Sequence, residues 1–196
     1  MTALHPFTPP IPTQRPVSQY TPTGELPELG DAELHPALDS PYGRRLAVPD
    51  RPTWTVGQLR DLTWTAITSL KSTMLDTVEF DSRERWWTRL ALTRGVEVWL
   101  LSWTPGQGTE PHAHGGASGS FSVLLGELEE HYRYPAGPVL SARHPGGSSI
   151  GFGSGRAHQV RNSGSRNAAS VHAYSPPLLP VLHYETLLDV PTQEVP

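Results

Sequence analysis

Two histidines one residue apart, His112 and His114 in the stretch PHAHGG, are the residues whose type and spacing most suggest chemistry. On a β-strand, side chains alternate between the two faces, so an HxH pair would direct both imidazoles to the same side. Two imidazoles held in this way are a good start for a metal site. Histidines also occur at surfaces and as hydrogen-bonded core residues, so the pair alone is weak evidence.

Glycine spacing and a third histidine strengthen this interpretation. The first block reads G-x5-H-x-H-x11-G, from Gly106 to Gly126, and a second block reads G-x5-G-x-G-x2-H-x3-N, from Gly147 to Asn162. Glycines at these points permit tight turns at strand ends. His158, in the second block, would then arrive on another strand facing the pair. We predict that His112, His114 and His158 bind a metal.

These two blocks resemble the two motifs of the cupin family. The resemblance implies a small double-stranded β-helix barrel with a metal inside. Gly153 stands where proline is usual, and the position of the usual glutamate ligand, seven residues before Gly126, is taken by Gly119. Three neutral imidazoles leave a divalent metal with its full charge and open positions, which suits an anionic thiolate together with dioxygen.

A further motif is SVHAYSPP, which begins at Ser170. Alternation places Ser170, His172 and Tyr174 on one strand face, where a hydroxyl, an imidazole and a phenol could form a hydrogen-bonded row. The simpler alternative is a buried tyrosine whose hydroxyl is satisfied for structural reasons.

The HxH pair without glutamate, the GxxH segment and SVHAYSPP together resemble the thiol dioxygenases, specifically the cysteine dioxygenase family, from about Trp86 to Pro177. The resemblance implies a mononuclear non-haem Fe(II) on His112, His114 and His158. It also implies that Tyr174 lies near substrate and oxygen, with Ser170 and His172 as its partners. Mammalian members have a cysteine, linked to the tyrosine, where this chain has Gly119. The chain has no cysteine, so it cannot form that crosslink.

The family also binds the substrate carboxylate with an arginine in a Tyr-x-Arg segment. The best match is RWWTRLALT, with Trp87 in the tyrosine position and Arg89 as the arginine. Arg85 shares their face by alternation and is the competing choice. A guanidinium suits a carboxylate because its donors can pair with both oxygens. Relatives that act on 3-mercaptopropionate commonly have glutamine here, so an arginine favours cysteine.

The expected function is therefore an Fe(II)-dependent thiol dioxygenase that converts L-cysteine and O2 to cysteine sulfinate. The alternatives are 3-mercaptopropionate or another small thiol as substrate, a metal-binding cupin without turnover, and a non-oxidative cupin enzyme such as a sugar isomerase. The polar row beside the metal argues against a plain binding barrel, and the absent glutamate argues against the isomerase.

Three segments of different texture are expected to position these residues. Residues 1–50 are rich in proline and polar residues, which favours a largely irregular arm. Residues 51–80 should form a helical segment packed on the barrel, because apolar residues recur at helical intervals from Val56 to Met74, with Thr53 or Thr55 as N-cap. Residues 81–196 should form the barrel, within a single globular domain.

Short β-prone segments separated by turns follow Phe80, which indicates an antiparallel sandwich or barrel. They are WWTRLALT, VEVWLLSW, SFSVLLGELEEHYRY, SSIGFGSG, HQVRNSG and ASVHAYS. With the cupin resemblance, we expect a mainly β fold, a double-stranded β-helix (jelly-roll) barrel with N-terminal helices packed on it. Trp99 and Trp103 should fill the barrel core or line its mouth.

Composition limits the other options. The absence of cysteine excludes disulfides, thiolate zinc sites and cysteine nucleophiles. A net charge of -4 gives no basic footprint for nucleic acid. Apolar runs are too short for a membrane span, and the start of the sequence does not resemble a secretory signal. We expect a cytoplasmic monomer or weak homo-oligomer whose partners are a small thiol and O2.

The remaining histidines are expected to be structural or superficial. They are His5 and His35 in the arm, His131 and His144 at strand or turn surfaces, and His183, which could pack under the barrel.

Overall fold

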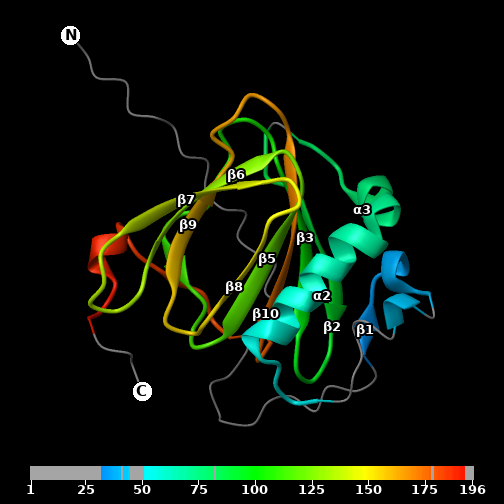
Figure 1. The fold of residues 1–196 in the computed structure, drawn as a ribbon, viewed down its shortest axis with the longest axis horizontal. Coiled ribbons are helices and arrows are strands. Elements are labelled where there is room, and N and C mark those ends of the chain that lie inside the picture. The colour runs from blue at the N-terminus through cyan, green and yellow to red at the C-terminus, as the bar shows by residue number, and fades with distance from the viewer. Residues whose placement is uncertain (1–31, 41, 45–50, 82, 178, 193–196) are drawn as a thin grey trace.

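The computed structural model describes residues 32–192 except 41, 45–50, 82 and 178 (Figure 1). Most of the arm expected over residues 1–50 therefore lies outside the described residues. Its described part contains a short strand, β1 (Glu33–Leu34), and a 3-10 turn, η1 (Pro36–Leu38), whose Leu38 is buried. His35 caps this turn, because its Nδ1 accepts a hydrogen bond from the Ala37 amide.

The helical segment forms as two helices, α2 (Val56–Ser69) and α3 (Lys71–Thr77). Thr55 caps α2 reciprocally with Gln58, since each side chain accepts a hydrogen bond from the other residue's amide. The apolar positions recur at helical intervals without interruption from Val56 to Met74. The helix instead breaks at Leu70, whose backbone (φ -112°, ψ 20°) leaves the helical region.

Two antiparallel sheets form the rest of the described chain. The larger sheet contains, in spatial order, β1, β2 (Trp87–Leu92), β3 (Glu97–Trp103), β10 (Ala168–Ser175), β5 (Ser118–Leu125) and β8 (Ser149–Phe152). The smaller sheet contains β11 (Leu182–His183), β4 (His112–Ala113), β9 (Ala157–Arg161), β6 (Glu127–Arg133) and β7 (Leu140–Pro145). A second 3-10 turn, η2 (Leu187–Asp189), follows β11. The predicted mainly β, double-stranded β-helix fold is confirmed.

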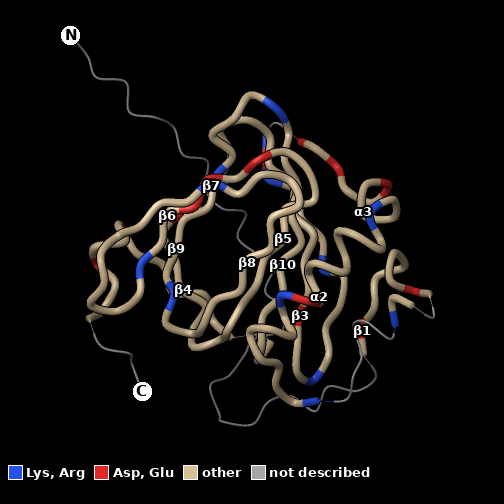
Figure 2. The backbone as a smooth tube through the Cα atoms, in the orientation of Figure 1, with Lys and Arg blue, Asp and Glu red and all other residues tan. Residues whose placement is uncertain are grey.

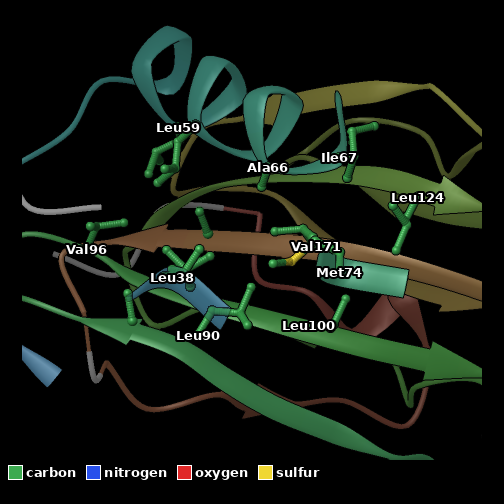
Figure 3. Close-up of a cluster of buried hydrophobic side chains, with 14 of the residues drawn as sticks. Leu38, Leu59, Ala66, Ile67, Met74, Leu90, Val96, Leu100, Leu124 and Val171 are labelled. Atoms are coloured by element: carbon green, nitrogen blue, oxygen red, sulfur yellow. The ribbon is translucent and has the colours of Figure 1, made fainter. Parts of the chain in front are cut away.

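The two faces of the larger sheet bury different side chains. On the outer face, α2 crosses the sheet and packs on a hydrophobic cluster that includes Leu100 and Val171 (Figure 3). These two residues are paired across β3 and β10, whereas the next pair, Leu101 and Ser170, faces into the barrel. The same alternation directs the whole row of polar side chains on β10 toward the interior.

Charged residues are absent from β5, β8 and β10, which run as uncoloured tube through the middle of Figure 2. They occur instead on β6 and β7, where acidic and basic positions mark the tube. Among the described residues, the structure has no helix long and apolar enough to cross a membrane.

Candidate active site

The three predicted metal ligands come together between β4 and β9. His112 on β4 is paired with His158 on β9, and His114 follows β4 at a turn whose next residue, Gly115, has a φ of 57°. One nitrogen from each of the three rings lies within 4.8 Å of the other two. These side chains could therefore hold a metal ion.

The ring nitrogens are arranged as metal binding would require. His112 and His158 each use Nδ1 for a hydrogen bond, to the Glu110 carbonyl at 2.8 Å and to the Glu130 carboxylate at 2.7 Å. Each therefore keeps Nε2 for another partner. Both ring nitrogens of His114 are buried and have no hydrogen-bond partner among the described residues. Such orphaned atoms are costly unless something binds them, and a metal ion fits this requirement.

The protonation of this group also suits a metal. Burial lowers the pKa of His112 and of His114 well below the usual histidine value, and the neighbouring His158 lowers both further. The neutral imidazole is the form that binds a metal, so no proton has to be displaced from these two rings near neutral pH.

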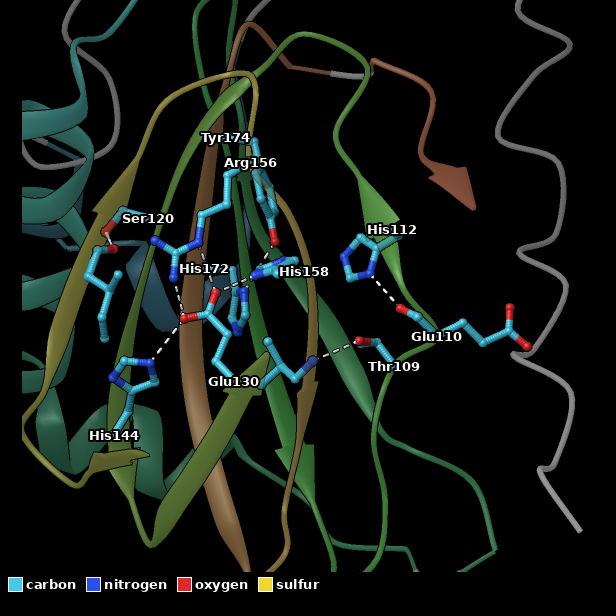
Figure 4. Close-up of polar contacts among 12 residues, drawn as sticks. Thr109, Glu110, His112, Ser120, Glu130, His144, Arg156, His158, His172 and Tyr174 are labelled. Atoms are coloured by element: carbon cyan, nitrogen blue, oxygen red, sulfur yellow. Dashed lines mark hydrogen bonds and ion pairs between the residues drawn. The ribbon is translucent and has the colours of Figure 1, made fainter. Parts of the chain in front are cut away.

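A hydrogen-bonded row lies beside the three histidines, as alternation along β10 predicted. Figure 4 shows two members of this row, His172 and Tyr174. The Trp103 indole donates to Ser170 Oγ at 2.9 Å, Ser170 Oγ lies 2.8 Å from His172 Nε2, and His172 Nδ1 lies 3.1 Å from the Tyr174 hydroxyl. The Tyr174 ring stacks on His114 at 4.4 Å between centroids, so the row ends against a candidate ligand.

The row is held in its uncharged state. Burial, with contributions from the charges of His158 and Arg85, lowers the pKa of His172 to about 3. Burial also raises the pKa of Tyr174 above its usual value. At neutral pH the row therefore consists of a hydroxyl, a neutral imidazole and a neutral phenol. Each of these groups can donate and accept hydrogen bonds without carrying a charge.

Gly119 is enclosed by aromatic rings. It is paired with Tyr174 on β10 and with Phe152 on β8. A Cβ at this position would overlap the Phe152 ring and lie 3.0 Å from Tyr174 Cδ1. The space for a glutamate or cysteine side chain is thus already filled by Phe152.

The two candidate arginines have different surroundings. Arg89, on β2, forms an ion pair with Glu33 Oε2 at 2.8 Å and lies over the Trp99 ring, which Trp87 contacts edge-on. Arg85, just before β2, lies 4.7 Å over the buried Trp103 ring. Its Nη1 has a long contact of 3.4 Å with the Gly108 carbonyl, and its buried Nε has no partner in the described part of the chain.

Sequence reasoning missed a buried polar cluster centred on Glu130, which is 0% exposed. The carboxylate accepts hydrogen bonds from Arg156 Nε at 3.1 Å and from Arg156 Nη2, and it lies 3.0 Å from His144 Nε2 and 2.7 Å from His158 Nδ1. Burial alone would raise the pKa of Glu130, but the hydrogen bonds from His144 and His158 and the charge of Arg156 outweigh it. The net pKa lies well below the usual value.

His144, expected at the surface, is therefore wrongly predicted: it is 9% exposed because β7 turns it toward Glu130. Period-two alternation along ELEEHYR puts Leu128 and Glu130 on the same inward face, and this was the available signal. His183 is half exposed rather than packed under the barrel, and it lies across from His112 on β11.

Residues 66–186, more than half of the chain, match the family model described as cysteine dioxygenase type I. No curated protein matches the chain. Similar solved structures include a protein with a double-stranded beta-helix domain from Klebsiella pneumoniae, with 21% identity, 58% of this chain, 95% of that chain and a TM-score of 0.48. A second protein, from Thermus thermophilus, has 19% identity, 53% and 93% coverage and a TM-score of 0.46. An oxalate oxidase has 19% identity, 56% and 61% coverage and a TM-score of 0.49.

The match to the family model contains each of the three histidines that could hold a metal, as well as the polar row on β10. The chain belongs to the cysteine dioxygenase type I family, a family of dioxygenases that act on small molecules with O2.

Proposed function

We propose that this protein is a non-haem Fe(II) thiol dioxygenase that oxidises L-cysteine with O2 to cysteine sulfinate. The observation that carries the proposal is the group of three histidines, one with both ring nitrogens unpartnered among the described residues, placed against an uncharged hydrogen-bonded row. His112, His114 and His158 would hold the iron. The iron would supply coordination positions for the substrate thiolate and for dioxygen.

Tyr174 would act from the end of the row. With Ser170 and His172 behind it, the phenol is held beside His114 and remains protonated at neutral pH. It would orient the thiolate or the oxygen through a hydrogen bond, a positioning role that lowers the barrier without any change of charge on the protein.

For the substrate carboxylate, Arg85 is better supported than Arg89. Arg85 has an unpartnered buried Nε and lies over Trp103, the tryptophan that begins the polar row. Arg89 would first have to release Glu33, and Trp87 beside it offers no hydroxyl. A free guanidinium fork can pair with both oxygens of a carboxylate.

The proposed activity is tested by oxygen consumption with the full chain loaded anaerobically with Fe(II). L-cysteine, 3-mercaptopropionate and cysteamine are compared at equal concentrations. Uptake should be fastest with cysteine and should be lost in His158→Ala. Fastest uptake with 3-mercaptopropionate would replace cysteine by that substrate. Metal binding without thiol-dependent uptake, or full activity in His158→Ala, would overturn the dioxygenase.

The choice of arginine predicts a split in the kinetics. Arg85→Gln should raise KM for cysteine by about 10- to 100-fold, since a charged hydrogen bond is worth about 1.5–3 kcal/mol. The same substitution should change KM little for cysteamine, which has no carboxylate. Arg89→Gln is the matched control and should leave both values close to those of the unmodified protein. The opposite pattern would assign the carboxylate to Arg89.

A further inference from the structure

Glu130 is a buried carboxylate that the proposed reaction does not use directly. It lies on β6, between β7 and β9. On the face turned into the barrel, its diagonal neighbours are His144, opposite Leu128, and His158, opposite Tyr132. The carboxylate thus has one histidine on each side, and Arg156 pairs with both carboxylate oxygens of Glu130 (Figure 4). The Arg156 guanidinium also lies over the Tyr132 ring, 3.5 Å from its centroid.

The contact between Glu130 and His158 fixes which nitrogen of His158 carries a proton. An ionised carboxylate only accepts hydrogen bonds, so His158 Nδ1, 2.7 Å away, must be the donor. In the neutral imidazole, which is the form that binds a metal, Nε2 then carries no proton and its lone pair is available. His112 reaches the same state through the Glu110 carbonyl, which is a neutral acceptor. Among the three histidines, His158 is the one held by a full negative charge in the described structure.

The contact between Glu130 and His158 also matters because Gly119 has no side chain that could serve as a carboxylate ligand. The position that provides a carboxylate ligand in other cupins has no side chain here, and Phe152 fills the space. The nearest buried carboxylate is instead one hydrogen bond behind a ligand. We propose that Glu130 is a positioning residue of the metal centre, which holds the Nδ1 proton of His158 and supplies from behind that ring the negative charge that Gly119 does not provide.

Arg156 and His144 have the supporting role in this arrangement. Together they donate three hydrogen bonds to the carboxylate oxygens, which hold Glu130 in place and keep it ionised. A charged partner behind a histidine ligand orients the ring and raises its basicity, and loss of such a partner weakens metal binding. The inference rests on the proposed metal centre, but it concerns metal affinity and does not depend on the substrate or on turnover.

The test measures Co(II) affinity of the metal-free full chain by competition with a chelator, together with thermal unfolding. Glu130→Leu/Arg156→Met removes both charges while keeping side-chain volume, a replacement that buried ion pairs often tolerate. Co(II) affinity should fall by about 10- to 100-fold relative to Arg156→Met alone. Glu130→Gln keeps an acceptor for His158 but not the charge, so its affinity should lie between those two variants.

Arg156→Met is the matched control, because it breaks the ion pair but leaves the contact between Glu130 and His158. It should reduce thermal stability, and it should lower Co(II) affinity by less than the double variant does, because His144 still donates to Glu130. Equal Co(II) affinity in folded Glu130→Gln and in the unmodified protein would overturn the inference. A loss of Co(II) affinity in Arg156→Met as large as that in the double variant would overturn it too. If the double variant does not fold, Glu130→Gln decides alone. Absence of Co(II) binding by the unmodified protein would overturn the metal centre itself.

Discussion

Individual side chains decide how charge is distributed around this site. A histidine binds a metal as the neutral imidazole, and the polar row of Ser170, His172 and Tyr174 carries no charge at neutral pH. Charge therefore has to come from the substrate or from outside the ligand set. This requirement is consistent with a thiolate substrate, and it makes the buried carboxylate of Glu130 significant.

The packing around Gly119 leads to a prediction at the scale of one residue. Gly119→Cys should not form a thioether link with Tyr174, and it should lower the free energy of unfolding by about 1–3 kcal/mol, because the added atoms overlap the Phe152 ring. Intact mass reports the link, which removes hydrogen, and denaturant unfolding reports the stability.

Phe152→Leu provides the control for that prediction. In the Gly119→Cys/Phe152→Leu protein, the smaller side chain should relieve the overlap and recover part of the lost stability. A link to Tyr174 in the single variant, at unchanged stability, would show that Phe152 does not occupy the space.

At the scale of elements, sequence reasoning predicted local features better than pairings. Alternation along β10 correctly predicted the polar row. The glycine spacing correctly predicted that His158 lies on a strand facing the HxH pair. Both inferences needed only the geometry of single strands and two motifs. The strand β7 was missed, because LSARHP is not strongly β-prone by composition.

The Glu130 cluster was missed for a different reason. Its members come from β6, from β7, from the turn before β9 and from β9 itself, so that recognising the cluster requires knowing which strands pair. The same holds for Phe152, which reaches Gly119 only through the pairing of β5 with β8. Long-range pairings of this kind cannot be read from the periodicity of one segment.

The cap of α2 gives a prediction for an element. Thr55→Ala should lower the free energy of unfolding by about 1 kcal/mol, because it removes the side-chain acceptor for the Gln58 amide at the start of the helix. Thr53→Ala, two residues earlier, lies outside the helix and should have little effect. Denaturant unfolding of both variants compares them directly. An equal loss in the two would mean that the cap does not contribute.

At the scale of the whole molecule, the described barrel buries the charged cluster around Glu130 among mostly uncharged side chains. The larger sheet is covered by α2 on one face (Figures 1 and 3). Its other face carries the polar row and is turned toward the site. Burial thereby shifts the pKa values of several histidines well below their values in water. The free energy of unfolding therefore depends on pH.

Metal-free protein should lose stability as the pH falls below about 6.5. The pKa of His172 is lowered from 6.5 to about 3 on folding, so the unfolded chain binds the proton first. Its contribution is fully present above pH 6.5 and is lost between pH 6.5 and 3, at about 1.4 kcal/mol per pH unit. The low pKa values of His112 and His114 act in the same direction.

Urea unfolding of metal-free protein at several pH values measures this dependence. His172→Gln should reduce the slope of unfolding free energy against pH by about 1.4 kcal/mol per unit between pH 6 and 4. An unchanged slope in that variant would mean that His172 is not held neutral by burial.

The pairing of His112 with His158 has a consequence for the chain as a polymer. The strand that carries His112 has only two residues, and its partner lies far along the sequence, beyond the hairpin of β6 and β7. An ion shared by the two strands would join distant points of the backbone as a covalent crosslink does, and would remove conformational freedom from the unfolded ensemble. The chain has no cysteine and so no disulfide. The stabilisation by a metal crosslink would instead depend on the metal concentration: an ion at 100 times its Kd adds about 2.7 kcal/mol to the free energy of unfolding.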